Sequence, residues 1–187
     1  MGWEVMKAEN WDVKPGIIRR KIGVGMDAAF EDALPSEGVH EVSFTIVKSP
    51  LGCVCLYLGI CDAEHVHKYK QRSSNPNVEE EIVAWAFCGA CGYLCHFRSP
   101  HEEYSSGWRQ HAMPKTQNLA DTKRAKGAVV KAIVDMDKRT LAFKVNDEEL
   151  VDAKVELPAS VRPFILISQT DDTIRMSVTR LETAPPA

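Results

Sequence analysis

The sequence predicts an all-β fold in which two antiparallel sheets pack face to face as a β-sandwich with long rim loops. Three observations lead to this prediction. Short runs of β-branched, aromatic and small apolar residues recur along the chain, and glycine, proline or polar clusters separate them. Several of these runs alternate apolar with polar residues, as half-buried strands do. The connections 62–80 and 98–126 are long and polar, so loops should carry the functional residues.

In the first half of the chain, the predicted strands are 17–24, 42–47 and 53–61. The run 42–47 alternates most clearly, because its even-numbered residues are all large and apolar. The sequence Ser49-Pro50-Leu51-Gly52 is a turn signal that ends this strand. Whether residues 1–37 add strands to the sandwich is left open.

In the second half, residues 82–88 and 93–97 flank Gly89-Ala90-Cys91-Gly92 and predict a hairpin. The later predicted strands are 128–134, 140–145, 161–168 and 173–178. Short helical turns are an equal alternative at 77–86, where three glutamates suit a first helical turn, and at 120–126.

Composition favours one globular domain spanning 1–187, since 44% of the residues are hydrophobic and 26% are charged. A net charge of −3 without a basic stripe gives no support to nucleic-acid binding. No apolar run approaches the ~20 residues that cross a bilayer, so no membrane role is expected. The six cysteines are expected as free thiols in the cytoplasm, with the nucleus possible, because no export signal is visible.

A series of sequence strings resembles the SPRY domain. The most specific is a strand ending in Asp135-Met136-Asp137, then Thr140-Leu141-Ala142-Phe143, and a turn at Asn146. Further strings of the family, in its order, are resembled by Gly38–Val42, Tyr57–Cys61, Ala84–Phe87, Gly92–His96, Leu157-Pro158 and Arg162-Pro163-Phe164. The resemblance covers roughly 38–179, with 1–37 as an N-terminal extension and 180–187 as a tail. Asp147 stands where the family's turn has a φ > 0 glycine, which marks a divergent member.

The resemblance implies a concanavalin-like sandwich that acts as a non-catalytic protein-interaction module without a cofactor. It is closest to the short SPRY domains of adaptors that present targets to ubiquitin ligases. It also implies that three loops converge at one end to bind a peptide or partner protein. By position, these loops are Ser49-Pro50-Leu51, the segment from Asp62 to Tyr69, and Gln169-Thr170-Asp171.

Two aromatic residues are the predicted anchors of a protein interface. Tyr69 lies in the second of these loops, and Trp108 lies in an insertion at 104–111. Tyrosine and tryptophan often dominate interface energy. The alternative for both residues is that they pack onto their own domain, as aromatic side chains of ordered loops commonly do.

Other functions have weaker signals. Cys88 and Cys91 form a C-x-x-C-G string that could begin a zinc site, with Cys53, Cys55 or His65 as further ligands. A second C-x-x-C is absent, and tetrahedral zinc needs four ligands, so reduced thiols are the simpler interpretation. A carbohydrate-binding sandwich is a further alternative. No catalytic residues are predicted, because no motif offers a convergent nucleophile and base.

Overall fold

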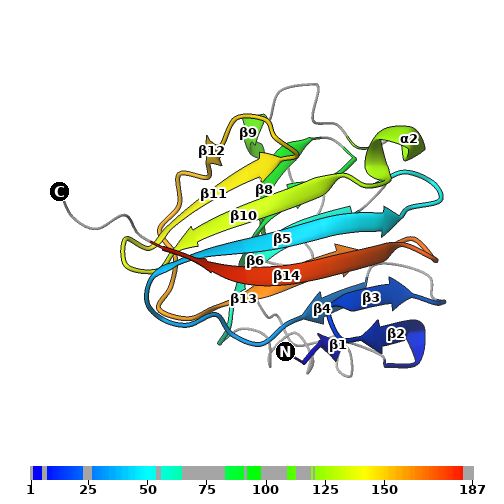
Figure 1. Ribbon diagram of the computed structural model, residues 1–187, viewed down its shortest axis with the longest axis horizontal. Coiled ribbons are helices and arrows are strands. Elements are labelled where there is room, and N and C mark those ends of the chain that lie inside the picture. The colour runs from blue at the N-terminus through cyan, green and yellow to red at the C-terminus, as the bar shows by residue number, and fades with distance from the viewer. Residues whose placement is uncertain are drawn as a thin grey trace, which may run out of the picture.

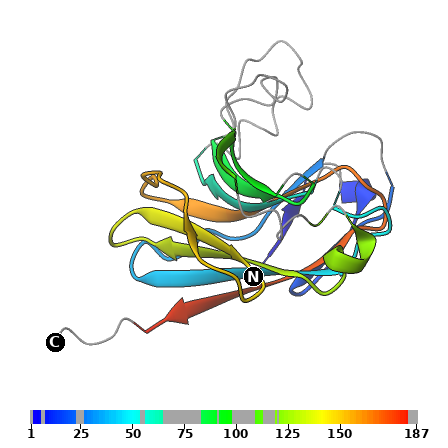
Figure 2. The same ribbon diagram turned by 90° about the horizontal axis from the view of Figure 1, so that it is seen from above.

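The computed structural model describes residues 2–5, 8–22, 27–53, 56–64, 83–90, 92–97, 109–112, 119 and 121–182. Two seven-stranded antiparallel sheets pack face to face (Figures 1 and 2). Sheet A has the order β1 (Glu4–Val5), β4 (Asp27–Phe30), β13 (Val161–Ile167), β6 (Leu56–Asp62), β7 (Ala84–Cys88), β8 (Tyr93–Phe97) and β9 (Arg109–Ala112). Sheet B has the order β12 (Val151–Asp152), β11 (Thr140–Val145), β10 (Val129–Asp135), β5 (Val39–Lys48), β14 (Thr173–Leu181), β3 (Ile17–Arg20) and β2 (Trp11–Lys14). The predicted β-sandwich is therefore confirmed.

The predicted helical turns have different outcomes. The turn expected within 120–126 is present as α2 (Thr122–Ala125), and a second short turn, η1 (Ala8–Asn10), precedes β2. The helix considered over 77–86 is not formed at its end, because residues from Ala84 onward belong to β7. Residues 77–82 lie outside the described residues. Among the described residues, no helix has the length and apolar character needed to cross a bilayer.

The main core lies between the sheets, and the strands of sheet B supply it by simple alternation. Along β5, Val42, Phe44 and Ile46 are fully buried, while the residues between them are partly exposed. The neighbouring strand β10 alternates in the same way. This period of two results from the pleat of a strand, which turns successive side chains to opposite faces.

The central strands of sheet A are buried on both faces, and this explains where several cysteines lie. All five residues of β7 are buried. A second apolar cluster, distinct from the main core, contains Cys61, Cys88 and Cys95 together with Phe30 and Phe164, whose ring centroids are 5.6 Å apart. Burial raises the pKa of the Cys61 thiol well above its ordinary value. These cysteines behave as small apolar residues of the sheet.

Gly59 sets the spacing between β6 and β7. A Cβ atom at this position would lie 2.0 Å from the Trp85 carbonyl oxygen and 2.6 Å from the Ala86 Cα atom. Both are backbone atoms of the paired strand, so no side-chain rotation could relieve the contact. A glycine at position 59 of β6 is therefore a requirement of sheet packing.

The turn between β11 and β12 corrects one expectation from the sequence. Positive φ was expected at Asp147, where the family has glycine. In the structure Asn146 takes the left-handed conformation, with φ at 53°, and Asp147 does not. The Asn146 Oδ1 atom accepts a hydrogen bond from the Val129 amide at 2.9 Å. Asparagine tolerates this conformation, so Asp147 costs the turn little.

Candidate functional site at one end of the sandwich

Three chain segments meet at the end of sheet B where β5 stops, at the right of Figure 1. We call this site the rim and define it as residues 19–22, 47–52 and 168–172. The Asp171 amide donates to the Arg20 carbonyl at 2.8 Å, and the Arg20 amide donates to the Asp172 carbonyl at 3.1 Å. These two backbone bonds tie the end of β3 to the loop that precedes β14.

On the surface of the rim, Asp171 joins two cations. Its carboxylate accepts hydrogen bonds from Arg19 at 2.5 Å and from Lys48 at 3.1 Å. The hydrogen bond from Arg19, and to a smaller extent the one from Lys48, lowers the pKa of Asp171 below its ordinary value. Asp171 itself has a φ of 72°, so its carboxylate is placed by a tight left-handed turn. The contact bridges β3, β5 and the 168–172 loop.

Beneath the surface, Ser49 joins two rim segments through buried groups. Its hydroxyl lies 2.7 Å from the Asp172 Oδ1 atom and 2.7 Å from the Gly52 carbonyl oxygen. Asp172 is fully buried and Ser49 nearly so. Burial raises the pKa of Asp172 to about 6, against the opposing effects of the Ser49 hydrogen bond and the Arg20 charge.

Arg20 is a fully buried arginine at the base of the rim. Its guanidinium donates to the Ile167 carbonyl, the last residue of β13. A buried cation needs such hydrogen bonds to offset the loss of water. Arg20 therefore links β3 of sheet B to β13 of sheet A where the rim begins.

Three large apolar side chains at the rim face solvent. Leu51 is 64% exposed, Ile22 is 58% exposed and Val47 is 37% exposed. Pro50 is exposed beside Leu51. In the described part of the chain, the other exposed large apolar residues are Val13 and Leu150. The rim thus combines exposed aliphatic groups with loops that are held by buried polar contacts.

The structure brings two of the three predicted loops together. Pro50, Leu51 and Thr170 are exposed at the rim, and Gln169 is partly buried there, donating to the Ser168 hydroxyl at 3.3 Å. Ser49 is also at the rim, but its side chain points inward, toward Asp172.

Asp62 lies at the other end of sheet A, which corrects the expectation of a single convergent site. In the pairing of β6 with β13, Asp62 is opposite Val161, whereas Leu56 is opposite Ile167, beside the rim. At ~3.4 Å per residue, β6 separates Asp62 from the rim by about 20 Å. The loop beginning at Asp62 therefore starts at the wrong end, and Tyr69 and Trp108 lie outside the described residues.

The hairpin that carries the C-x-x-C string packs on Cys53. A Cβ atom at Gly89 would lie 2.4 Å from the Cys53 Cβ atom, so Cys53 does lie against the hairpin. Burial raises the pKa of the Cys53 thiol to about 12, which keeps it protonated. No group of three or more His, Cys, Asp or Glu residues that could hold a metal occurs among the described residues. Cys55, His65 and Cys91 are outside them.

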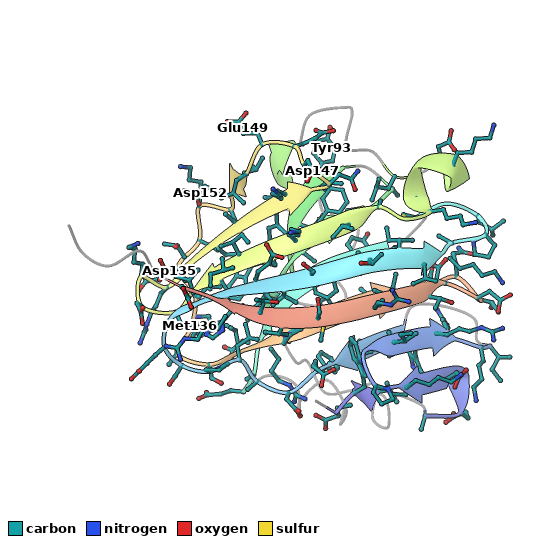
Figure 3. The ribbon with its side chains drawn as sticks, viewed as in Figure 1. Tyr93, Asp135, Met136, Asp147, Glu149 and Asp152 are labelled. Atoms are coloured by element: carbon teal, nitrogen blue, oxygen red, sulfur yellow. The ribbon has the colours of Figure 1, made fainter. Side chains whose placement is uncertain are left out.

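The strings that resemble the SPRY family do not build the rim. The Asp137 carboxylate accepts from the Gly38 amide at 2.8 Å, and the Asp135 carboxylate accepts from the Lys138 amide at 2.9 Å. The Asp137 bond fastens the β10–β11 turn to the start of β5, and the Asp135 bond closes the turn itself, at the end opposite the rim. Figure 3 shows Asp135 and Met136 there, while Asp147, Glu149 and Asp152 follow the outer edge at β12. The motif residues therefore stabilise the fold.

Structural comparison identifies the fold. The SPRY domain of human HERC1 matches with a TM-score of 0.63 and 16% identity, over 97% of this chain and 100% of that chain. The chain has the fold of a SPRY domain. The TRIM65 PSpry domain matches this SPRY fold with a TM-score of 0.57 and 9% identity, over 95% of this chain and 92% of that one.

The same architecture also occurs in carbohydrate-binding proteins. The exoplasmic/lumenal domain of VIP36, in a form bound to Ca²⁺ and Man3GlcNAc, matches with a TM-score of 0.55 and 10% identity, over 98% of this chain and 86% of that one. No protein-family model and no curated protein sequence matches this chain. The SPRY-type fold is thus shown by structure, and its ligand is not inherited from any of these proteins.

Proposed function

We propose that this SPRY-type domain is a non-catalytic protein-interaction module that binds a short peptide or partner protein through the rim. The observation that carries the proposal is the exposure of Leu51, Ile22 and Val47 at the same end of the sandwich. Exposed large apolar groups that gather in one region of a folded surface are typical of binding sites.

The rim loops are held in a defined conformation by hydrogen bonds, and this supports the proposal. The turn that carries Leu51 is closed by a hydrogen bond from the Gly52 amide to the Ser49 carbonyl at 3.2 Å, and Asp172 contacts Ser49 from the next loop. A surface that is already ordered loses less conformational entropy when it binds. Arg19 and Lys48 flank the apolar groups and provide the polar rim that surrounds the core of most interfaces.

The absence of catalysis belongs to the same proposal. Asp172 and Ser49 are the closely placed polar pair of the site, but both are buried and bonded within the fold, so a substrate could not reach them. Asp171 is held by two cations. A general base must be within hydrogen-bond reach of its substrate, and neither carboxyl group meets this condition. A resident cofactor is not part of the proposal.

The cysteines are the basis for a proposal about the cellular compartment of the domain. Cys53 and Cys61 are free thiols, and both are buried. Free thiols are typical of reducing compartments, which supports a cytoplasmic or nuclear adaptor with a protein partner, rather than one that binds nucleic acid or membrane. A single domain over 1–187, with 1–37 as an extension of the 38–179 core and 180–187 as a tail, is the corresponding proposal for its organisation.

Substitution of Leu51 tests the proposal. Leu51→Asp should abolish the binding of ligands selected from a library of random peptides, because a charge would replace the central apolar group. Leu150→Asp is a matched control, since Leu150 is also an exposed leucine, 48% accessible, but lies far from the rim before β12. If the selected peptides bind Leu51→Asp and the native protein equally, the rim is not the binding site.

The predicted aromatic anchors need their own variants. Tyr69→Ala and Trp108→Ala should weaken the same peptides if these residues extend the interface. If both folded variants bind as the native protein does, the two anchors are withdrawn and the rim proposal stands on Leu51.

Carbohydrate binding is the second candidate, and the architecture shared with the VIP36 domain favours it. A glycan array probed with the purified protein decides between the two. A saturable glycan signal that survives Leu51→Asp would favour the sugar, whereas a blank array would leave the peptide proposal alone.

A zinc-stabilised module using Cys88 and Cys91 is the third candidate. Metal analysis of the native protein tests it, and less than one zinc per chain would end it.

A further inference from the structure

The Ser49 hydroxyl stands between two oxygen atoms that both require a hydrogen. One is the Gly52 carbonyl oxygen and the other is Asp172 Oδ1, each at 2.7 Å. A serine hydroxyl has one hydrogen to donate, so it can satisfy only one of them. The second contact becomes a hydrogen bond only if the carboxyl group brings a proton and donates it to the Ser49 Oγ atom.

We propose that Asp172 is a proton-operated latch that holds the two rim loops 48–52 and 168–172 together. In the closed form, the carboxyl of Asp172 donates to Ser49, and Ser49 donates to the Gly52 carbonyl. When Asp172 loses its proton, Ser49 turns its hydrogen to the carboxylate, and the Gly52 carbonyl loses its partner. The chain of two hydrogen bonds is thereby reduced to one.

The surroundings of Asp172 favour the protonated form. The side chain is fully buried, and its Oδ2 atom has no hydrogen-bond partner among the described residues. An ionised carboxylate would leave this oxygen both charged and unsolvated, which is costly in a protein interior. The geometry and the cost of burial therefore point in the same direction.

Among the described residues, two charged groups act on this carboxyl, and one neutral thiol is close to it. Arg20, from β3, favours the ionised form through its charge, and Asp171, the neighbouring residue, opposes it. The Cys53 thiol, from the loop after β5, stays protonated and brings no charge. Burial outweighs the Arg20 charge and leaves the pKa of Asp172 at about 6. The latch thus closes when a neutral solution becomes mildly acidic.

The latch controls the part of the rim that displays Leu51. Ser49 and Gly52 begin and end the turn in which Leu51 is 64% exposed. When the hydrogen bond to the Gly52 carbonyl is lost, fewer hydrogen bonds hold this turn, and it opens more often. Any ligand that binds the ordered turn is then coupled to proton binding. The latch itself does not depend on the proposed function, because it is a property of the free protein.

Carbon NMR of the Asp172 carboxyl group tests the inference in the native protein. We expect a titration centred near pH 6, whereas an unperturbed aspartate titrates near 3.9. Amide exchange at Gly52 and Asp171 should slow when Asp172 binds its proton, after correction for the intrinsic effect of pH. The pKa shift from about 4 to about 6 corresponds to a factor of about one hundred. Protonation can therefore slow amide exchange by at most about a hundredfold.

Two variants separate the latch from other pH effects. Asp172→Asn carries an amide that always donates to Ser49, so exchange at Gly52 should stay slow and lose its transition near pH 6. Asp171→Asn removes the partly exposed carboxylate next to it and should keep that transition.

A titration of Asp172 at an ordinary aspartate value would overturn the inference even if neither variant folded. A transition that persists in Asp172→Asn would also overturn it. Neither result would bear on peptide binding at the rim, which Leu51→Asp tests separately.

Discussion

Replacing Gly59 by alanine should separate β6 from β7. The added Cβ would lie 2.0 Å from the Trp85 carbonyl oxygen, more than an ångström short of van der Waals contact. The strand pairing from Tyr57 opposite Cys88 to Cys61 opposite Ala84 would have to yield. Overpacking of a rigid core costs about 1 to 3 kcal/mol, and more when backbone must move, so we expect a loss of about 3 kcal/mol or more.

Urea denaturation of Gly59→Ala and the native protein measures this loss as a shift of the midpoint at constant slope. Gly127→Ala is the matched control. It places alanine at a φ of 84° but in open space, with no atom within 4 Å. It should cost about 1 kcal/mol, from backbone conformation alone. If Gly59→Ala costs no more than Gly127→Ala, the close approach of the two strands is wrong.

Three further predictions concern the core and the rim. Phe44→Ala, at a fully buried position of β5, should lower the free energy of unfolding by about 3 to 5 kcal/mol in the same assay, and a loss below 1 would contradict its place in the core. Ser49→Ala should cost about 1 to 3 kcal/mol, because it leaves a buried carboxyl oxygen without its partner; a neutral result would remove Ser49 from the loop contact. The fold raises the pKa of Asp172 to about 6, so it favours the protonated carboxyl group. This contribution to stability is complete at about pH 4 and below, and it is lost as the pH rises to about 6. The native protein should therefore lose about 2 to 3 kcal/mol relative to Asp172→Asn across that range, and parallel curves of stability against pH for the two proteins would refute it.

The sandwich could be predicted from sequence because its signals are local. The alternation of Val42, Phe44 and Ile46 marks one strand, and the bonds of Asp135 and Asp137 show that the Asp-x-Asp string forms the β10–β11 turn, as its sequence indicates. Sheet A was harder to predict in detail. Its strand β7 is buried on both faces, and such strands lose the alternation that separates inside from outside.

The rim was only partly predictable. Loop positions follow from the order of strands, which is why the sequence could place Leu51 and Thr170 at the same end of the sandwich. Asp62 was misplaced because β6 begins beside the rim with Leu56 and runs away from it, so the loop after Asp62 emerges at the opposite end of the sheet. The roles of Arg20 and Asp172 were missed for a related reason. In the sequence, Arg20 follows another arginine and Asp172 follows another aspartate, so both look like solvated charges. Their burial becomes visible only when β3 is paired with β14.

If partners bind at the rim, a photo-crosslinking amino acid at position 51 should capture them. The modified protein is illuminated in native lysate, and the same group at position 150 serves as the control on another exposed leucine. We expect a discrete protein adduct from position 51 that is absent at position 150 and is suppressed by a peptide selected for rim binding. A discrete adduct at position 150 alone, or none that the peptide suppresses, would contradict it.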